Sequence, residues 1–103
     1  MNNEMKILGL LGLAQRARQL VTGEDLVIRS LRSQQIKFIF LSSDAGKAVA
    51  KKIHDQCQYY GVPMCAEFSK QKLSQAIGQP RTVIGVTQTG FVKRFIQLTN
   101  NQK

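Results

Sequence analysis

The sequence predicts an α/β fold, a three-layer α/β/α sandwich, on three observations. Segments in which apolar residues recur at helical spacing alternate with short β-rich apolar runs, and this order favours a sheet between two helix layers. Hydrophobic residues make up 43% of the chain and charged residues 20%, which is typical of globular proteins. No linker, internal repeat or low-complexity segment divides residues 1–103, so we expect a single domain.

The first two predicted elements are helices over residues 3–20 and 22–33. Apolar residues recur at three- and four-residue spacing through the first helix, which starts at a capping asparagine. Thr22 and Asp25 approximate a capping box for the second helix, and Gly23 lies in the turn between the two. A strand immediately before this glycine is too short to be predicted from its composition.

Strand and helix then alternate three times. The predicted strands cover residues 37–42, 63–68 and 82–87, and the predicted helices cover residues 45–60, 69–78 and 89–100. Ser43 and Asp44 form the cap signal of the first of these helices, and Ser69 is the cap of the second. Gly61 stands where a left-handed residue ends a helix, and Gly78 stops the next one.

The charge balance makes nucleic acid the expected partner. Fifteen Lys and Arg face six Asp and Glu, and a net charge of +9 attracts polyanions. The alternatives are a cationic surface that only keeps the protein in solution, or contact with a membrane surface. No apolar stretch approaches the roughly 20 residues that a membrane span needs. No secretory leader is recognised either, so we expect a cytoplasmic protein without a membrane partner.

Residues that could carry enzymatic or metal chemistry are scarce. His54 and Cys57 are spaced i, i+3 on a predicted helix, but zinc needs four ligands and Cys65 is the only other soft one. The single histidine has no evident Ser or Cys nucleophile beside it. The adjacent carboxylates Glu24 and Asp25 cannot share a helix face. We therefore predict no enzyme activity and no metal site, and we interpret both cysteines as reduced core residues.

Basic residues gather at three places along the chain. These are Arg16 and Arg18, then Arg29, Arg32 and Lys37, then Lys47, Lys51 and Lys52. A solvated cationic face is the simplest interpretation. Glu24 and Asp25, however, occupy a helix N-terminus whose backbone N–H groups could otherwise hold phosphate. They either cap the helix and offset its dipole, or accept hydrogen bonds from the N1–H and N2–H₂ edge of an unstacked guanine.

Several segments together resemble a known protein family. Residues 10–17 read LLGLAQRA, residues 20–25 read LVTGED and residues 36–45 read IKFIFLSSDA. The agreement continues through residues 59–63 and 73–78 to the terminal strand and helix. In this collinear order the chain resembles the YlxQ-type bacterial proteins, which are similar to the archaeal L7Ae ribosomal proteins. The resemblance implies a four-stranded mixed sheet, no cofactor, and recognition of kink-turns, which are RNA bends built around a bulge and tandem sheared G·A pairs.

The resemblance places one RNA-contacting segment at the start of the second helix. There the wider family carries a Gly-x-Asn-Glu signature that reads guanines, and the matching residues are Gly23, Glu24, Asp25 and Leu26. Arg29 holds the cationic place one turn later. Asp25 in place of Asn loses a donor, and Leu26 in place of Glu loses an acceptor, for which Glu24 is the substitute.

A second contacting segment, which covers the extruded bulge nucleotide in the family, matches residues Gln79, Pro80, Arg81 and Thr82. Pro80 is expected to give the apolar cover, and Arg81 to meet phosphate or stack on a base. YlxQ-type sequences tend to carry glycine where this chain has Arg18. This arginine therefore either adds a phosphate contact or is only solvated.

We predict that these groups of residues divide the recognition of RNA between them. Gly23 to Asp25 read the G·A end of the bend, and Gln79 to Thr82 contact its bulge. The cations Arg29, Arg32 and Lys37 grip phosphates, with Arg16, Arg18 and Lys47 as further candidates. The family makes a ribosomal RNA the expected ligand and ribosomal proteins candidate partners of a monomer. The alternative is a ribosome- or assembly-associated protein-interaction module whose charge adds only nonspecific RNA attraction.

Overall fold

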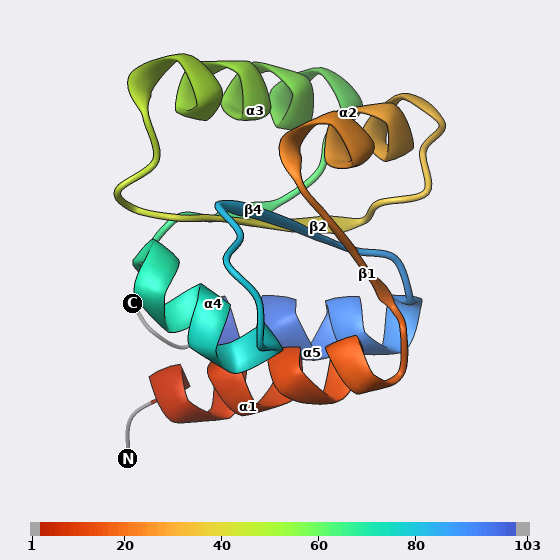
Figure 1. Ribbon diagram of the computed structural model, residues 1–103. Coiled ribbons are helices and arrows are strands. Elements are labelled where there is room, and N and C mark those ends of the chain that lie inside the picture. The colour runs from red at the N-terminus through yellow and green to blue at the C-terminus, as the bar shows by residue number, and fades with distance from the viewer. Residues whose placement is uncertain (1–2, 101–103) are drawn as a thin grey trace.

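A computed structural model of the protein describes residues 3–100, in which four strands lie between two layers of helices (Figure 1). The elements are α1 (Asn3–Arg16), β1 (Leu20–Thr22), α2 (Glu24–Arg32), β2 (Phe38–Leu41), α3 (Lys47–Tyr60), β3 (Met64–Cys65), α4 (Lys70–Ile77), β4 (Val83–Val86) and α5 (Thr89–Asn100). Helices α2 and α3 cover one face of the sheet, and α1, α4 and α5 cover the other. The predicted α/β/α sandwich is confirmed.

The sheet is mixed, with strand order β1-β4-β2-β3. Strand β4 runs antiparallel to both β1 and β2, whereas β2 and β3 are parallel. One row of the sheet therefore aligns Thr22, Ile84, Phe40 and Cys65. All residues of the two central strands are buried, because helices cover both faces, and this explains their uninterrupted apolar sequences.

Two separate cores follow from the alternation of side chains along β2. Phe38 and Phe40 point into the layer of α1, α4 and α5, and Ile39 and Leu41 into the layer of α2 and α3. On the first side Phe95 contacts both phenylalanines, with ring centroids 5.9 Å from Phe38 and 4.9 Å from Phe40. Burial of each such side chain contributes about 1.5–3 kcal/mol to folding.

The first helix is shorter than the sequence predicts. It ends at Arg16, and Arg18 follows in the left-handed conformation, with φ 58°. The backbone N–H of Gln19 donates to the Ala14 carbonyl over 2.9 Å, which closes the helix end. Leu20 belongs instead to β1, where it pairs with Val86 of β4. Pairing with a distant strand thus overrides the local helical pattern.

Two of the predicted helix caps are wrong. Gly23, not Thr22, is the N-cap of α2, and it makes no side-chain cap hydrogen bond. Gly46 precedes α3, while Asp44 Oδ1 accepts a hydrogen bond over 2.9 Å from the Lys70 backbone N–H in the first turn of α4. This hydrogen bond lowers the pKa of the Asp44 carboxyl. Asp44 therefore stabilises the start of α4, and not the start of α3, which is the next helix in the sequence.

The predicted start of α4 and the predicted ends of α3 and α4 agree with the structure. Ser69 Oγ accepts from the backbone N–H of Lys72 over 3.2 Å, as an N-cap of α4 should. Gly61 and Gly78 end α3 and α4 in the left-handed conformation, with φ 67° and 78°. The strand predicted over residues 63–68 contracts to β3, because only its first part pairs with β2.

Candidate nucleic-acid interface

The two segments predicted to contact RNA lie side by side. Because β1 and β4 are antiparallel, the residue after β1 meets the beginning of β4, and Gly23 N–H donates to the Val83 carbonyl over 3.2 Å. The Arg81 Nε atom donates to Thr22 Oγ1 over 3.1 Å. These two hydrogen bonds hold residues 23–25 against residues 79–82 at one corner of the sheet. We call these two segments together the Gly23 corner.

Gly23 gives this corner an open backbone. Its φ of 94° lies in the region that L-residues avoid and glycine tolerates. A Cβ atom built on it would meet no heavy atom within 4 Å. Its carbonyl accepts the Val27 N–H over 3.0 Å and so begins α2, but glycine has no side chain to cap the other first-turn amides. The positive end of the helix dipole is thus accessible beside the open backbone.

The two carboxylates after Gly23 have different surroundings. Glu24 Oε2 accepts a hydrogen bond over 3.1 Å from Nζ of Lys52, an ion pair between α2 and α3. The Asp25 side chain is exposed and has no hydrogen bond or ion pair within residues 3–100. Glu24 is therefore oriented and partly neutralised, while both carboxylate oxygens of Asp25 are free to accept hydrogen bonds from a ligand.

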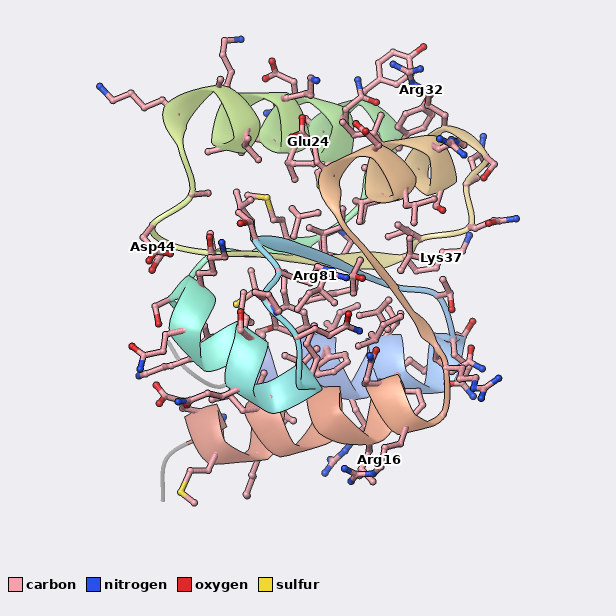
Figure 2. All side chains as sticks on the ribbon, viewed as in Figure 1. Arg16, Glu24, Arg32, Lys37, Asp44 and Arg81 are labelled. Atoms are coloured by element: carbon pink, nitrogen blue, oxygen red, sulfur yellow. The ribbon has the colours of Figure 1, made fainter. Side chains whose placement is uncertain are left out.

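A cationic groove of about 340 Å³ runs between α2 and α3 beside these residues. It is lined by Asp25, Ile28, Arg29, Arg32, Lys52 and Gln56. Arg29 and Arg32 are three residues apart and share the exposed face of α2, and Figure 2 shows Arg32 on the outer side of this helix. Three cations against one carboxylate give the groove a net positive charge, which suits the phosphates of a nucleic-acid backbone.

Arg81 shapes the loop before β4 instead of extending into solvent. Besides the bond to Thr22, its Nη1 donates to the Pro80 carbonyl over 2.7 Å and its Nη2 to Gln79 Oε1 over 2.8 Å. Its backbone N–H donates to Ser74 Oγ over 3.1 Å. Three of the five guanidinium N–H donors are thus used internally. These hydrogen bonds tie the loop to β1 and α4, and Pro80 is exposed.

Four of the predicted cations lie outside the groove. Arg16 projects from α1, on the opposite face of the sheet from α2 (Figure 2), and Arg18 follows the same helix. Lys37 precedes β2 and lines a separate hollow with Gln34 and Tyr60. Lys47 is exposed at the first residue of α3. The fold therefore does not bring these four residues to the Gly23 corner.

Two residues at this interface were not among the predicted RNA contacts. Lys52 lines the groove and pairs with Glu24, although its spacing alone does not distinguish it from Lys47 or Lys51. Leu26 is an exposed apolar side chain, 52% accessible, directly after Asp25. An apolar residue in the first turn of a helix was the signal in the sequence for this candidate contact. From the sequence, we interpret Leu26 only as the loss of the hydrogen-bond acceptor that a glutamate would supply.

Neither a metal-ligand cluster nor a membrane-spanning helix is present in the part of the chain that the structure describes. Residues 3–100 contain no group of three or more His, Cys, Asp or Glu side chains that could hold a metal ion. In the same residues no helix is long and apolar enough to cross a membrane. Cys57 and Cys65 are unpaired thiols in the core, and burial raises the pKa of both.

Comparison with known sequences places the chain in a family. The sequence profile of the "Ribosomal protein L7Ae/L30e/S12e/Gadd45 family" matches residues 5–93. The chain belongs to this family. The matched residues include both segments of the Gly23 corner and both helices of the cationic groove, so the interface lies in the part of the L7Ae-family fold that the profile covers.

Similar proteins extend this assignment to nearly the whole chain. The "RNA-binding protein YlxQ" of Enterococcus faecium is 41% identical over 96 residues, 93% of each chain. The protein of the same name from Bacillus subtilis (strain 168) is 46% identical over 90 residues, 86% of this chain and 90% of the relative. The resemblance to YlxQ-type proteins is confirmed.

Solved structures confirm the L7Ae-type fold. A protein with unknown function from Bacillus halodurans C is 44% identical, with a TM-score of 0.89 over 92% of this chain and 97% of that one. The Giardia lamblia 15.5kD RNA binding protein has a TM-score of 0.81 over 96% of this chain and 86% of its own. Its identity is only 14%, so this second likeness concerns the fold alone.

Proposed function

We propose that this L7Ae-family protein binds structured RNA and recognises kink-turns through the Gly23 corner and the α2–α3 groove. The observation that carries the proposal is the pair of hydrogen bonds, Arg81–Thr22 and Gly23–Val83, that joins two predicted contact segments beside a cationic groove. Two similar proteins named as RNA-binding support RNA as the ligand. The net charge of +9 supports it independently.

In this proposal, phosphate contacts supply most of the affinity. Arg29, Arg32 and Lys52 line the groove and meet the RNA backbone, which makes binding strongly dependent on salt. Lys37 and Lys47 lie beyond the groove and add long-range attraction. Arg16 and Arg18 lie on the α1 side of the sheet and do not touch the bent RNA.

In this proposal, the Gly23 corner recognises the shape of the bent RNA. The Asp25 carboxylate accepts hydrogen bonds from the N1–H and N2–H₂ edge of a guanine in a sheared pair, which the open backbone of Gly23 allows to approach. Leu26 and Pro80, both exposed, cover the extruded base with apolar surface. Arg81 keeps the loop in place for this contact.

We further infer the biological setting from the family. A family of ribosomal proteins supports a ribosomal RNA as the natural ligand and a cytoplasmic location, and ribosomal proteins are the expected neighbours. The protein acts as a monomer that binds RNA without catalysis and without a cofactor. Its like-charged surfaces oppose self-association.

Two substitutions test the division of labour. Arg29→Ala should weaken binding to a kink-turn and to a straight duplex alike, and should reduce the slope of log affinity against log salt by about 1. Asp25→Ala removes a negative charge, which by itself favours RNA binding, yet it should weaken the kink-turn selectively by roughly 10-fold or more.

The matched control for the second substitution is Asp55→Ala. Asp55 is an exposed carboxylate on α3 that pairs with Lys51 and does not line the groove, so its loss changes the net charge equally. An equal loss of affinity for kink-turn and duplex in Asp25→Ala would contradict the proposal. So would selective loss of kink-turn binding in the Asp55 control.

A further inference from the structure

A second groove, largely apolar, lies between α1 and α5 on the face of the sheet away from α2. It encloses about 520 Å³ and is lined by Met5, Lys6, Gly9, Leu10, Leu13, Arg16, Arg94 and Leu98. Met5 is 76% exposed and Leu13 is 51% exposed. Helices α1 and α5 run side by side beneath the sheet in Figure 1. The RNA proposal leaves this surface without a role.

Close packing within the fold does not account for Gly9 at this groove. Glycine inside a helix weakens the helix relative to alanine. Gly12, one turn later, is explained by packing, because an added Cβ would lie 3.1 Å from the Ala76 carbonyl oxygen of α4. A Cβ on Gly9 would meet no heavy atom within 4 Å. The missing side chain therefore leaves space on the outside of the protein, where another backbone could approach closely.

The charges around the groove define what can occupy it. Lys6, Arg16 and Arg94 are exposed at its edge, and no carboxylate is among the lining residues. Glu4, further along α1, is paired with Lys72 over 2.8 Å. A second copy of this chain would bring the same cations against these, which opposes a symmetric dimer. Nucleic acid would satisfy the cations but would leave the apolar lining against phosphates.

We propose that the α1–α5 groove is a docking site for an acidic amphipathic helix of a partner protein. The apolar stripe of that helix covers Met5 and Leu13, its backbone approaches at Gly9, and its carboxylates meet Arg16 and Arg94. Because this groove and the α2–α3 groove lie on opposite faces of the sheet, RNA bound along α2 and α3 leaves room for the partner helix. The inference does not depend on the RNA proposal.

The test uses the whole protein and display-selected helical peptides of about 15 residues, varied in sequence and net charge. Binding of the enriched peptides is then measured with two groove variants, Gly9→Gln and Arg94→Glu. Gly9→Gln fills the groove with a good helix former, so the variant stays folded. The controls are Ala48→Gln, exposed on α3, and Lys93→Glu, the neighbour of Arg94 that does not line the groove.

We expect enrichment of acidic peptides with an apolar stripe. Gly9→Gln and Arg94→Glu should weaken their binding roughly 10-fold or more, and the two controls should change it by less than about 2-fold. RNA affinity of Gly9→Gln should equal that of the unmodified protein. A basic protein attracts any acidic peptide, so binding by itself does not identify the site. The decisive result is that the two groove variants lose binding while the two control variants keep it.

Four results would overturn the proposal. The first is acidic peptides that bind Gly9→Gln as well as the unmodified protein, and the second is enrichment of basic or purely polar peptides. The third is a dimer that Gly9→Gln dissociates in sedimentation analysis, since this would make a second copy the occupant. The fourth is competition between peptide and a kink-turn RNA for one site, which would assign the groove to nucleic acid.

Discussion

Arg81 Nε donates a hydrogen bond to Thr22 Oγ1 over 3.1 Å, and this bond joins the loop before β4 to the last residue of β1. The same guanidinium also holds Gln79 and the Pro80 carbonyl within its own loop. A loop fixed before binding spends less free energy on ordering when the ligand arrives. In the proposed function, Arg81 therefore contributes to RNA recognition by keeping the loop in shape.

Thr22→Val tests this relationship with little change in side-chain size. The valine keeps the β-branched shape that suits β1 but removes the acceptor of the Arg81 hydrogen bond. We expect a loss of about 1 kcal/mol in the free energy of unfolding and a reduced preference for a kink-turn over a duplex. Duplex affinity and its salt dependence should not change. Thr22→Ser keeps the hydroxyl and should keep the preference, so equal behaviour of the two variants would contradict the assigned role.

Arg18→Gly should stabilise the protein. Arg18 has φ 58°, where a Cβ atom costs on the order of 1 kcal/mol that glycine avoids. We expect the free energy of unfolding in urea to rise by about 1 kcal/mol. Arg18→Ala removes the charge but keeps the Cβ, and should give no such gain. A similar gain in both variants would attribute the effect to charge and not to backbone conformation.

Gly85→Ala should destabilise the fold from the centre of the sheet. An added Cβ would overlap Ile36 Cδ1 and lie 2.9 Å from Ile36 Cγ1, and this side chain is buried and cannot move away. We expect a loss of about 1–3 kcal/mol in the free energy of unfolding. Combining Gly85→Ala with Ile36→Ala should cost less than the sum of the two single changes. Strict additivity would show that the two positions do not clash.

The buried thiol of Cys57 should make stability fall at alkaline pH. Burial raises the pKa of this thiol from its ordinary 9.0 to about 11, so the neutral form is favoured in the folded protein. Below pH 9 the buried neutral thiol contributes fully to the free energy of unfolding. Between pH 9 and 11 this contribution is lost, because Cys57 ionises in the unfolded chain but stays neutral in the folded protein. Cys57→Ala lacks this loss. The stability gap between the two proteins should therefore narrow over that range, and a constant gap in urea denaturation would contradict the assignment.

Much of the fold was predictable because local signals and tertiary structure agree. Residues 38–41 and 83–86 are buried on both sides, so their apolar runs indicate strands directly. Strand β1 carries no comparable signal, because three half-buried residues at the sheet edge become a strand only by pairing with β4. The end of α1 was not predictable because Arg18 takes the left-handed conformation there. A glycine at this position would have indicated the end of the helix.

The candidate interface was predictable only in part for a related reason. The segments at residues 23–25 and 79–82 were chosen from the family resemblance, and the antiparallel pairing of β1 and β4 explains why they meet. The ion pair between Glu24 and Lys52 depends on how α2 packs on α3. No spacing within either helix specifies it. The same is true of the internal hydrogen bonds through which Arg81 supports its loop.

The most direct test of shape recognition is a salt titration of the unmodified protein. Binding to a kink-turn RNA is compared with binding to the same strand made into a straight duplex, up to near-physiological ionic strength. We predict that both affinities fall with salt, because both depend on phosphate contacts, while the bend stays preferred by roughly 10-fold or more, about 1.4 kcal/mol. Equal affinities with the same steep salt dependence would contradict kink-turn recognition.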